Sequence, residues 1–207
     1  MILIILVVIL AIILVTVYEV FISKISNSLK VKSVNNYYIS PTKKKDTIKL
    51  KKQDKNNVCS YSFFIRTDLK TFENKKDWIV FYRGDKDKQN LKVIVSEKGN
   101  LTVIVNGSSM TVKNIIKLRK WTHIGICLNN INKFAELYIN GDLYKTTSMN
   151  NIKIGDKPLV INPENKDAYI QNLNYYLSML SSKQMKKLYE KLPLMVIINR
   201  YLFDYKQ

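Results

Sequence analysis

The chain has 207 residues, 46% of them hydrophobic and 24% charged, and 34 Lys and Arg against 16 Asp and Glu give it a formal net charge of +18. A single histidine and two cysteines, Cys59 and Cys127, are too few for a His/Cys metal centre or a disulfide framework, which excludes zinc domains and disulfide-rich secreted domains. We therefore expect one globular domain with no metal and no cofactor. We expect both cysteines to be buried and reduced. The alternative is a single long-range disulfide between them in an oxidising compartment.

Residues 1–22, MILIILVVILAIILVTVYEVFI, carry no charge before Glu19. As a helix they would reach about 33 Å, enough to cross a hydrocarbon core of roughly 30 Å. No basic residue precedes the apolar run and no small-residue cleavage site follows it, unlike a secretory signal peptide. The sequence thus predicts a single N-terminal transmembrane helix, with the lipid bilayer as a partner.

The charges after this run predict its orientation. Lys24, Lys30 and Lys32 follow the apolar residues, and Lys and Arg beside a membrane span tend to stay on the cytosolic side. We therefore expect a single-pass membrane protein with its domain on the cytosolic face. The glycosylation sequons at Asn100 and Asn106 would favour the lumenal side, but such tripeptides arise often by chance in an Asn-rich chain.

Residues 23–57 form a strongly basic segment, with ten lysines against two aspartates. It has little aliphatic clustering, so we expect a solvated linker. Such a run next to a bilayer can hold anionic lipid head groups, whereas nucleic acid, the rival partner, is not expected. The lysines assigned to lipid contact are Lys43, Lys44, Lys45, Lys49, Lys51 and Lys52.

From residue 58 the chain consists of short runs rich in Val, Ile, Tyr and Phe, separated by turn residues. We expect strands over 58–66, 77–83, 91–97, 100–107, 122–128 and 135–141. Residues 97–100 join two of these runs at hairpin distance, and Asn140-Gly141 is the strongest hairpin signal in the chain. Several strands that follow one another closely along the sequence, without intervening helices, predict an all-β, antiparallel β-sandwich.

One helix is expected near the C-terminus. Ser181 and Gln184 have the spacing of a capping box, Met185, Leu188 and Tyr189 form an apolar stripe, and Pro193 would stop the run. Residues 193–207 form an apolar tail. We expect it to add a strand to the sandwich, the alternative being a segment that docks onto a neighbouring subunit.

The order of motifs resembles the laminin-G-like domains of the concanavalin A-like lectin/glucanase superfamily. Residues 121–126, WTHIGI, and 135–143, AELYINGDL, resemble the family's central strand and the hairpin after it, and residues 169–176 and 180–189 resemble its last strand and closing helix. The resemblance implies a concanavalin A-like jelly roll over residues 58–192 with one short C-terminal helix.

The same motifs specify the fold and say little about catalytic or binding chemistry. We expect Trp121 and Tyr138 to pack in the core, His123 to have a structural place inside its strand, and Asn140 and Gly141 to form a turn with positive φ. A lone histidine without a nucleophile motif gives no support to catalysis. No catalytic residue is therefore assigned.

Acidic residues do not indicate an enzyme or a metal site. Glucanases of this fold use paired carboxylates, typically E-x-D-x-x-E, and no E-x-D occurs in the chain. Calcium could be bound by loop oxygens, but nearby lysines oppose this and no metal-loop spacing is present. The acids and amide considered are Asp85, Asp87, Asn162, Glu164 and Asp167.

The organisation as a whole, an apolar anchor, a basic linker and a sandwich without a catalytic motif, resembles membrane-anchored minor capsid proteins of large nucleocytoplasmic DNA viruses. That resemblance implies a non-enzymatic structural protein at the interface of the virion's inner membrane and its capsid, with other capsid or membrane proteins as partners. The alternative is a membrane-bound, lectin-like receptor that binds glycans. The lysines after residues 1–22 do not favour this alternative, because they predict a cytosolic domain.

Overall fold

The computed structural model describes residues 33–36, 45–50, 58–67, 77–85, 89–150, 152, 157–164 and 168–191. None of the helices in these ranges is long and apolar enough to span a membrane. The expected transmembrane segment 1–22 and the apolar tail from residue 193 lie outside the described residues, as does most of the basic linker.

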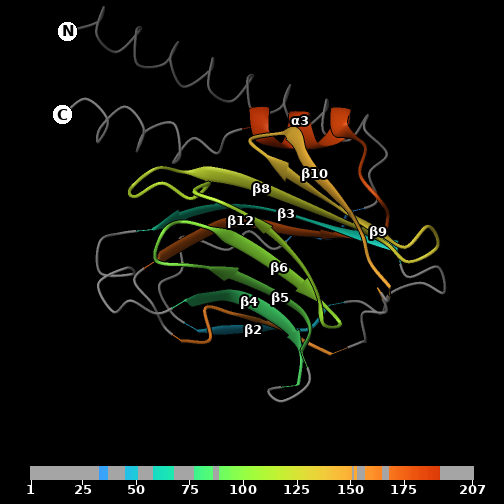
Figure 1. Cartoon of the computed structure of the whole chain (residues 1–207), viewed down its shortest axis with the longest axis horizontal. Coiled ribbons are helices and arrows are strands. Elements are labelled where there is room, and N and C mark those ends of the chain that lie inside the picture. Colours follow the sequence, from blue (N-terminus) through green and yellow to red (C-terminus); the bar gives the residue numbers. More distant parts are fainter. Residues whose placement is uncertain are drawn as a thin grey trace, which may run out of the picture. The chain divides into compact units, whose positions relative to one another are not determined.

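The described residues form two six-stranded antiparallel sheets that face each other (Figure 1). Sheet A has the order β1 (Ser33–Asn36), β12 (Ala168–Tyr176), β3 (Val58–Thr67), β8 (Thr122–Asn129), β9 (Phe134–Ile139), β10 (Asp142–Ser148). Sheet B has the order β2 (Asp46–Ile48), β11 (Leu159–Ile161), β4 (Trp78–Gly84), β5 (Gln89–Val95), β6 (Leu101–Val105), β7 (Ser108–Val112). The predicted all-β antiparallel sandwich is confirmed, and the structure adds β1, β2, β7, β10 and β11 to the predicted strands.

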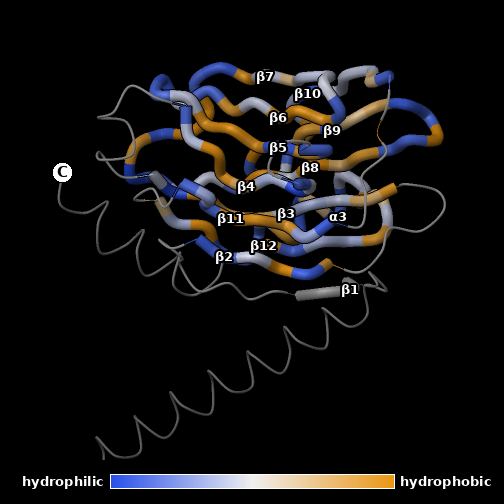
Figure 2. Tube along the Cα trace, turned by 90° about the horizontal axis from the view of Figure 1, so that it is seen from below, coloured by the Kyte–Doolittle hydropathy of each residue, from blue (hydrophilic) through white to orange (hydrophobic). Residues whose placement is uncertain are grey.

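The core lies between the sheets, where side chains alternate inward along each strand. Strands β5 and β6 show this most simply, because every second residue is buried and those between are half-buried. Aromatic contacts join the layers: the Phe63 and Phe81 rings lie 5.3 Å apart, and the Tyr61 and Phe81 rings 5.9 Å apart. Figure 2 looks onto sheet B and shows hydrophobic residues running along its central strands.

Trp78 is the large side chain that anchors this core. It is 1% exposed, and its indole Nε1 donates a hydrogen bond of 3.0 Å to Oδ1 of Asn162. A buried indole N–H needs such a partner to avoid a desolvation cost. Asn162, considered above as a calcium ligand, therefore has its amide oxygen engaged inside the sandwich.

Part of the predicted linker belongs to the sandwich. β1 pairs with β12, and β2 pairs with β11. Within the lysine-rich segment, Ile48 and Leu50 are 7% and 8% exposed and alternate with exposed residues. The prediction of a solvated linker over 23–57 is wrong at these positions, because an edge strand needs only a few inward apolar residues once a neighbouring strand supplies its hydrogen bonds.

Helix α3 (Ser182–Glu190) begins with the predicted capping box: Ser181 accepts from the backbone N–H of Gln184, and the Gln184 side chain accepts from the backbone of Ser181. The helix packs on the outer face of sheet A, where Met185 is buried against Gly125. A β-carbon at residue 125 would lie 2.6 Å from Sδ of Met185. Any larger residue at this position would require the end of the Met185 side chain to move.

Two hairpins use an Asn-Gly pair with positive φ at both residues. Asn140 and Gly141, at φ 52° and 85°, join β9 to β10, as predicted, and Asn106 and Gly107, at 46° and 87°, join β6 to β7. These angles are those of a type I′ turn. The two turns differ in their surroundings. A β-carbon at Gly141 would lie 3.0 Å from Cα of Lys186 in α3, whereas a β-carbon at Gly107 would have no atom within 4 Å.

This difference predicts how much the fold depends on the docked helix. Gly107→Ala should lower the free energy of unfolding by about 1 kcal/mol, the cost of a left-handed alanine. Gly141→Ala carries the same cost and also pushes the helix, so we expect a loss about 1 to 2 kcal/mol larger. Urea unfolding of the full chain in mild detergent, followed by tryptophan fluorescence, measures both. Equal losses would show that the 140–141 turn does not support α3.

Candidate binding site on the outer face of sheet A

The outer face of sheet A carries polar and aromatic side chains in register across β12, β3 and β8. Gln171 pairs with Phe64, and Phe64 pairs with His123. All three side chains are buried, at 1%, 3% and 0% exposure. Strands β3 and β8 are thus buried on both faces, unlike those of a simple sandwich with one solvated side.

His123 is held within this buried row. Its Nε2 lies 2.9 Å from Oγ of Ser62, and the Phe64 and Tyr189 rings lie 4.9 Å and 6.0 Å from the imidazole. Its Nδ1 is buried and has no hydrogen-bond partner among the residues that the structure describes. Because no solvent reaches the ring, burial lowers the pKa of His123 to about 4, and the side chain is neutral at physiological pH. The predicted structural place of His123 inside its strand agrees with this burial.

The next row, at the end of the sheet, is half-buried and contains Tyr169, Arg66 and Trp121. Tyr169 pairs with Arg66 across β12 and β3, and Trp121 directly precedes β8. The Arg66 guanidinium carbon lies 5.8 Å from the centre of the Tyr169 ring, and the Trp121 and Tyr169 rings are 6.4 Å apart. We call these three residues the aromatic–basic row.

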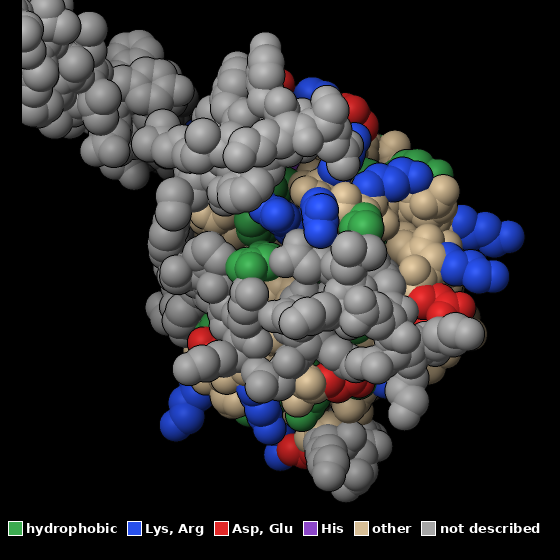
Figure 3. All heavy atoms as spheres, turned by 90° about the vertical axis from the view of Figure 1, so that its left-hand side faces the viewer, with side chains coloured by type: hydrophobic (Ala, Val, Ile, Leu, Met, Phe, Trp, Pro, Cys, Tyr) green, Lys and Arg blue, Asp and Glu red, His purple; other side chains and the backbone are tan. Residues whose placement is uncertain are grey.

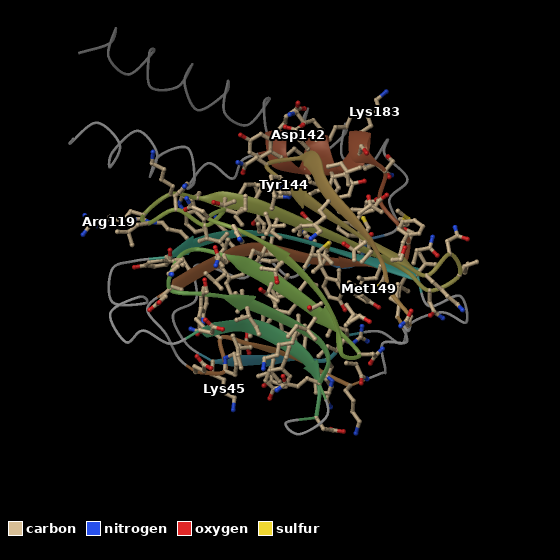
Figure 4. The ribbon with its side chains drawn as sticks, viewed as in Figure 1. Lys45, Arg119, Asp142, Tyr144, Met149 and Lys183 are labelled. Atoms are coloured by element: carbon tan, nitrogen blue, oxygen red, sulfur yellow. The ribbon has the colours of Figure 1, made fainter. Side chains whose placement is uncertain are left out.

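Next to this row lies a loop of exposed basic residues, Lys117–Lys120, which we call the basic loop. Lys117, Arg119 and Lys120 are exposed, and Leu118 between them is 39% exposed. Figure 3 views this end of the sandwich and shows Lys and Arg side chains beside hydrophobic ones, and in Figure 4 Arg119 points away from the strands. Cations and aromatic rings therefore share one end of sheet A.

The structure corrects two of the predicted core residues. Trp121 is half-buried and lies outside the sandwich core, and its buried Nε1 has no hydrogen-bond partner within the described part of the chain. Tyr138 is 2% exposed, but it lies under α3 on the outer face, where its hydroxyl donates to Glu136 at 2.8 Å and lies 3.2 Å from Oγ of Ser182. Tyr138 is therefore buried, as predicted, but under the helix and not between the sheets, and Trp121 directly precedes β8. Alternation alone does not say which face of a strand meets the partner sheet.

Asn140 has the turn role that the sequence predicted, and the structure adds a second one. Its backbone N–H donates to the His123 carbonyl at 2.9 Å, and its side-chain Oδ1 accepts from the His123 N–H at 3.1 Å. The turn therefore fixes the start of β8. The aromatic–basic row lies directly beside that start.

The two cysteines occupy opposite faces of sheet A. Cys59 points into the core, whereas Cys127 lies on the outer face, where its Sγ is 3.3 Å from Oγ of Ser60. Both are free and wholly buried. A bridge between them, left open by the sequence, would need a thiol to pass through the sheet.

Few of the lysines assigned to lipid contact can be placed. Lys45 and Lys49 are exposed and flank β2, while Lys43, Lys44, Lys51 and Lys52 lie outside the described residues. Among the candidate calcium ligands, Asp85 forms an ion pair with Lys157 at 3.2 Å and Glu164 is exposed. Within the described ranges no group of three or more His, Cys, Asp or Glu could hold a metal ion.

Sequence reasoning missed the aromatic–basic row. Arg66 and Tyr169 are about a hundred positions apart, and only the pairing of β12 with β3 brings them together. The basic loop did carry a sequence signal, because Lys117, Arg119 and Lys120 stand directly before Trp121.

The comparisons with known proteins agree with this architecture. Residues 35–196 match the model of the pentaxin family. The ligand-binding domain of botulinum neurotoxin serotype D, solved in complex with N-acetylneuraminic acid, has a TM-score of 0.61 at 18% identity; the match covers 76% of this chain and 42% of that one. The receptor-binding domain of the serotype C/D mosaic has a TM-score of 0.56 at 17% identity, covering 76% and 45%.

These similarities to solved structures show the fold. The chain spans less than half the length of the neurotoxin domains that it matches. No curated protein matches the chain.

The buried histidine predicts how stability depends on pH. His123 has a pKa of about 4 in the folded protein and an ordinary value near 6.5 when unfolded, so the unfolded chain binds the proton first as the pH falls. Its contribution is fully present above about pH 6.5 and is lost progressively towards pH 4, by roughly 3 kcal/mol. Urea unfolding between pH 7.5 and 4 should show this loss, and His123→Gln should flatten it. An unchanged slope in the variant would contradict the assignment to His123.

Proposed function

The chain belongs to the pentaxin family, and on this basis we propose that it is a non-enzymatic, lectin-like binding domain whose ligand is an acidic glycan. The observation that carries the proposal is the aromatic–basic row, in which Arg66 lies over Tyr169 beside Trp121. Half-exposed aromatic rings offer apolar faces to a sugar ring, and a guanidinium binds a sugar carboxylate with two parallel hydrogen bonds.

The surroundings of the row support an anionic ligand. The basic loop adds three exposed cations at the same end of sheet A. These charges would steer an acidic ligand toward the row and weaken as salt is added. Among the solved neighbours, one neurotoxin domain was crystallised with N-acetylneuraminic acid, an acidic sugar of this chemical class.

This proposal predicts that 3′-sialyllactose binds better than lactose, which has no carboxylate. Arg66→Gln should weaken sialyllactose binding at least tenfold, and Arg66→Lys less, because lysine keeps the charge without the planar fork. Lys92→Gln is the control for net charge, since Lys92 lies on the outer face of sheet B, and it should change binding less than twofold. Titration calorimetry on the full chain in detergent gives the affinities.

Two results would reject the proposal. One is equal affinity for the two sugars in the wild-type protein, and the other is an Arg66→Gln variant that binds like Lys92→Gln. Release of free sialic acid or galactose above a heat-killed control would contradict the non-enzymatic part.

A second candidate is a non-enzymatic structural protein that links a membrane to a protein shell, such as a minor capsid protein of a large nucleocytoplasmic DNA virus. The apolar residues 1–22 and the lysines after them favour it. A capsid role needs the domain on the cytosolic face, whereas a glycan receptor needs it on the lumenal or extracellular face.

The two candidates therefore predict opposite outcomes of a protease test. Sealed microsomes containing the full chain are treated with protease, and fragments are detected with an antibody to the sandwich. Digestion would favour the structural protein, as the lysines predict. Protection, together with a glycosidase-sensitive mass shift from Asn100 or Asn106, would favour the glycan receptor.

A further inference from the structure

We propose that the basic loop, Lys117–Lys120, is a contact surface for a bilayer that carries anionic head groups, with Leu118 entering the interface between the flanking cations. This rests on the proposed membrane tether and is independent of which sugar the domain binds. Leu118 is 39% exposed, and the three other residues of the loop, Lys117, Arg119 and Lys120, are exposed cations.

The loop is presented in a fixed conformation. Arg119 has a φ of 56°, and its N–H donates to the Thr67 carbonyl at 2.8 Å. Leu118 forms an isolated parallel β-bridge with Thr67, and the backbone N–H of Lys120 donates to the Lys117 carbonyl at 3.2 Å. Ile116, 2% exposed, anchors the start of the loop in the core. The loop therefore loses little conformational entropy when it meets a surface.

The charges around the loop favour an anionic partner. Lys98, in the β5–β6 turn, and Lys113, after β7, are also exposed at this end of the sandwich, and the described acids there are Asp77 and Glu97. Each cation close to an anionic bilayer surface contributes roughly 1 kcal/mol. An apolar side chain among such cations adds burial in the interfacial region, as in interfacial membrane anchors.

The length of chain between the expected span and the sandwich allows this end to reach the membrane. Because β1 starts at Ser33, only ten residues, 23–32, separate the sandwich from the expected span, instead of a 35-residue linker. Ten residues extend at most about 35 Å. Ser33 pairs with Tyr176 at one end of β12, and the basic loop lies at the other end of this nine-residue strand, about 30 Å away. The tether is thus long enough for the basic loop to touch the bilayer that holds residues 1–22.

The opposite end of β8 offers a matched control. Ile131, in the turn between β8 and β9, is 62% exposed and is the counterpart of Leu118 at the far end of that strand. Met149, whose N–H donates to the Lys133 carbonyl, marks this end, and Figure 4 shows it far from Arg119. The native cysteines, Cys59 and Cys127, are both wholly buried, so a cysteine introduced at either site can be labelled selectively.

The test uses the full chain in vesicles with Leu118→Cys or Ile131→Cys carrying an environment-sensitive fluorophore. Spin-labelled lipid should quench the probe at 118 at least threefold more in phosphatidylcholine/phosphatidylserine vesicles than in phosphatidylcholine vesicles, and leave the probe at 131 unchanged. Lys117→Gln, Arg119→Gln and Lys120→Gln combined should reduce quenching at 118 to the level of 131, as should 0.5 M salt.

The outcomes separate the proposals. A chain that floats with the vesicles but shows equal quenching at 118 and 131, or equal quenching at 118 in both vesicle types, overturns the loop contact and leaves the tether standing. A chain that does not float with vesicles overturns both. The vesicles carry no sugar, so none of these results depends on glycan binding.

Discussion

The burial of β3 and β8 on both faces is the constraint on which the rest of the structure depends. Eight of the ten residues of β3 and all eight of β8 are buried, so each strand needs a packing layer on either side. Sheet B supplies the inner layer through the core, and α3 supplies part of the outer one. In a strand that is buried on both faces, the residues of both faces lack access to water. Polar residues such as Ser62 and His123 therefore occupy buried positions on the outer face.

The glycines of sheet A make the outer layer possible. Gly125 leaves the space that the end of the Met185 side chain occupies, and Gly141 leaves space for Lys186 and Tyr189 of α3 beside the hairpin. The same hairpin holds the start of β8 through Asn140 and His123. The short helix thereby packs against the hairpin that holds the start of β8, next to Trp121 of the aromatic–basic row.

Burial on the outer face of sheet A decreases toward one end, and this gradient accounts for the candidate site. One row, formed by Gln171, Phe64 and His123, is buried from solvent. The next row toward the end of the sheet, formed by Tyr169, Arg66 and Trp121, is half-buried. The aromatic–basic row thus lies at the boundary between the closed and the half-buried part of this face. The exposed Lys117, Arg119 and Lys120 of the adjacent basic loop give this end of the sheet a local excess of positive charge.

The sequence by itself determined the class of fold, because alternating β-branched runs, the Asn140-Gly141 turn and the Ser181 capping box are local signals that depend on no distant part of the chain. It also carried the order of elements that resembles laminin-G-like domains. Only the tertiary structure decided that Ile48 and Leu50 join the sandwich and that Trp121 and Tyr138 face outward, because strand alternation fixes two faces without saying which meets the other sheet. The juxtaposition of Arg66 with Tyr169 and the opposite faces of Cys59 and Cys127 were likewise decided by strand register, which brings together residues from distant parts of the chain and is encoded in no short segment of it.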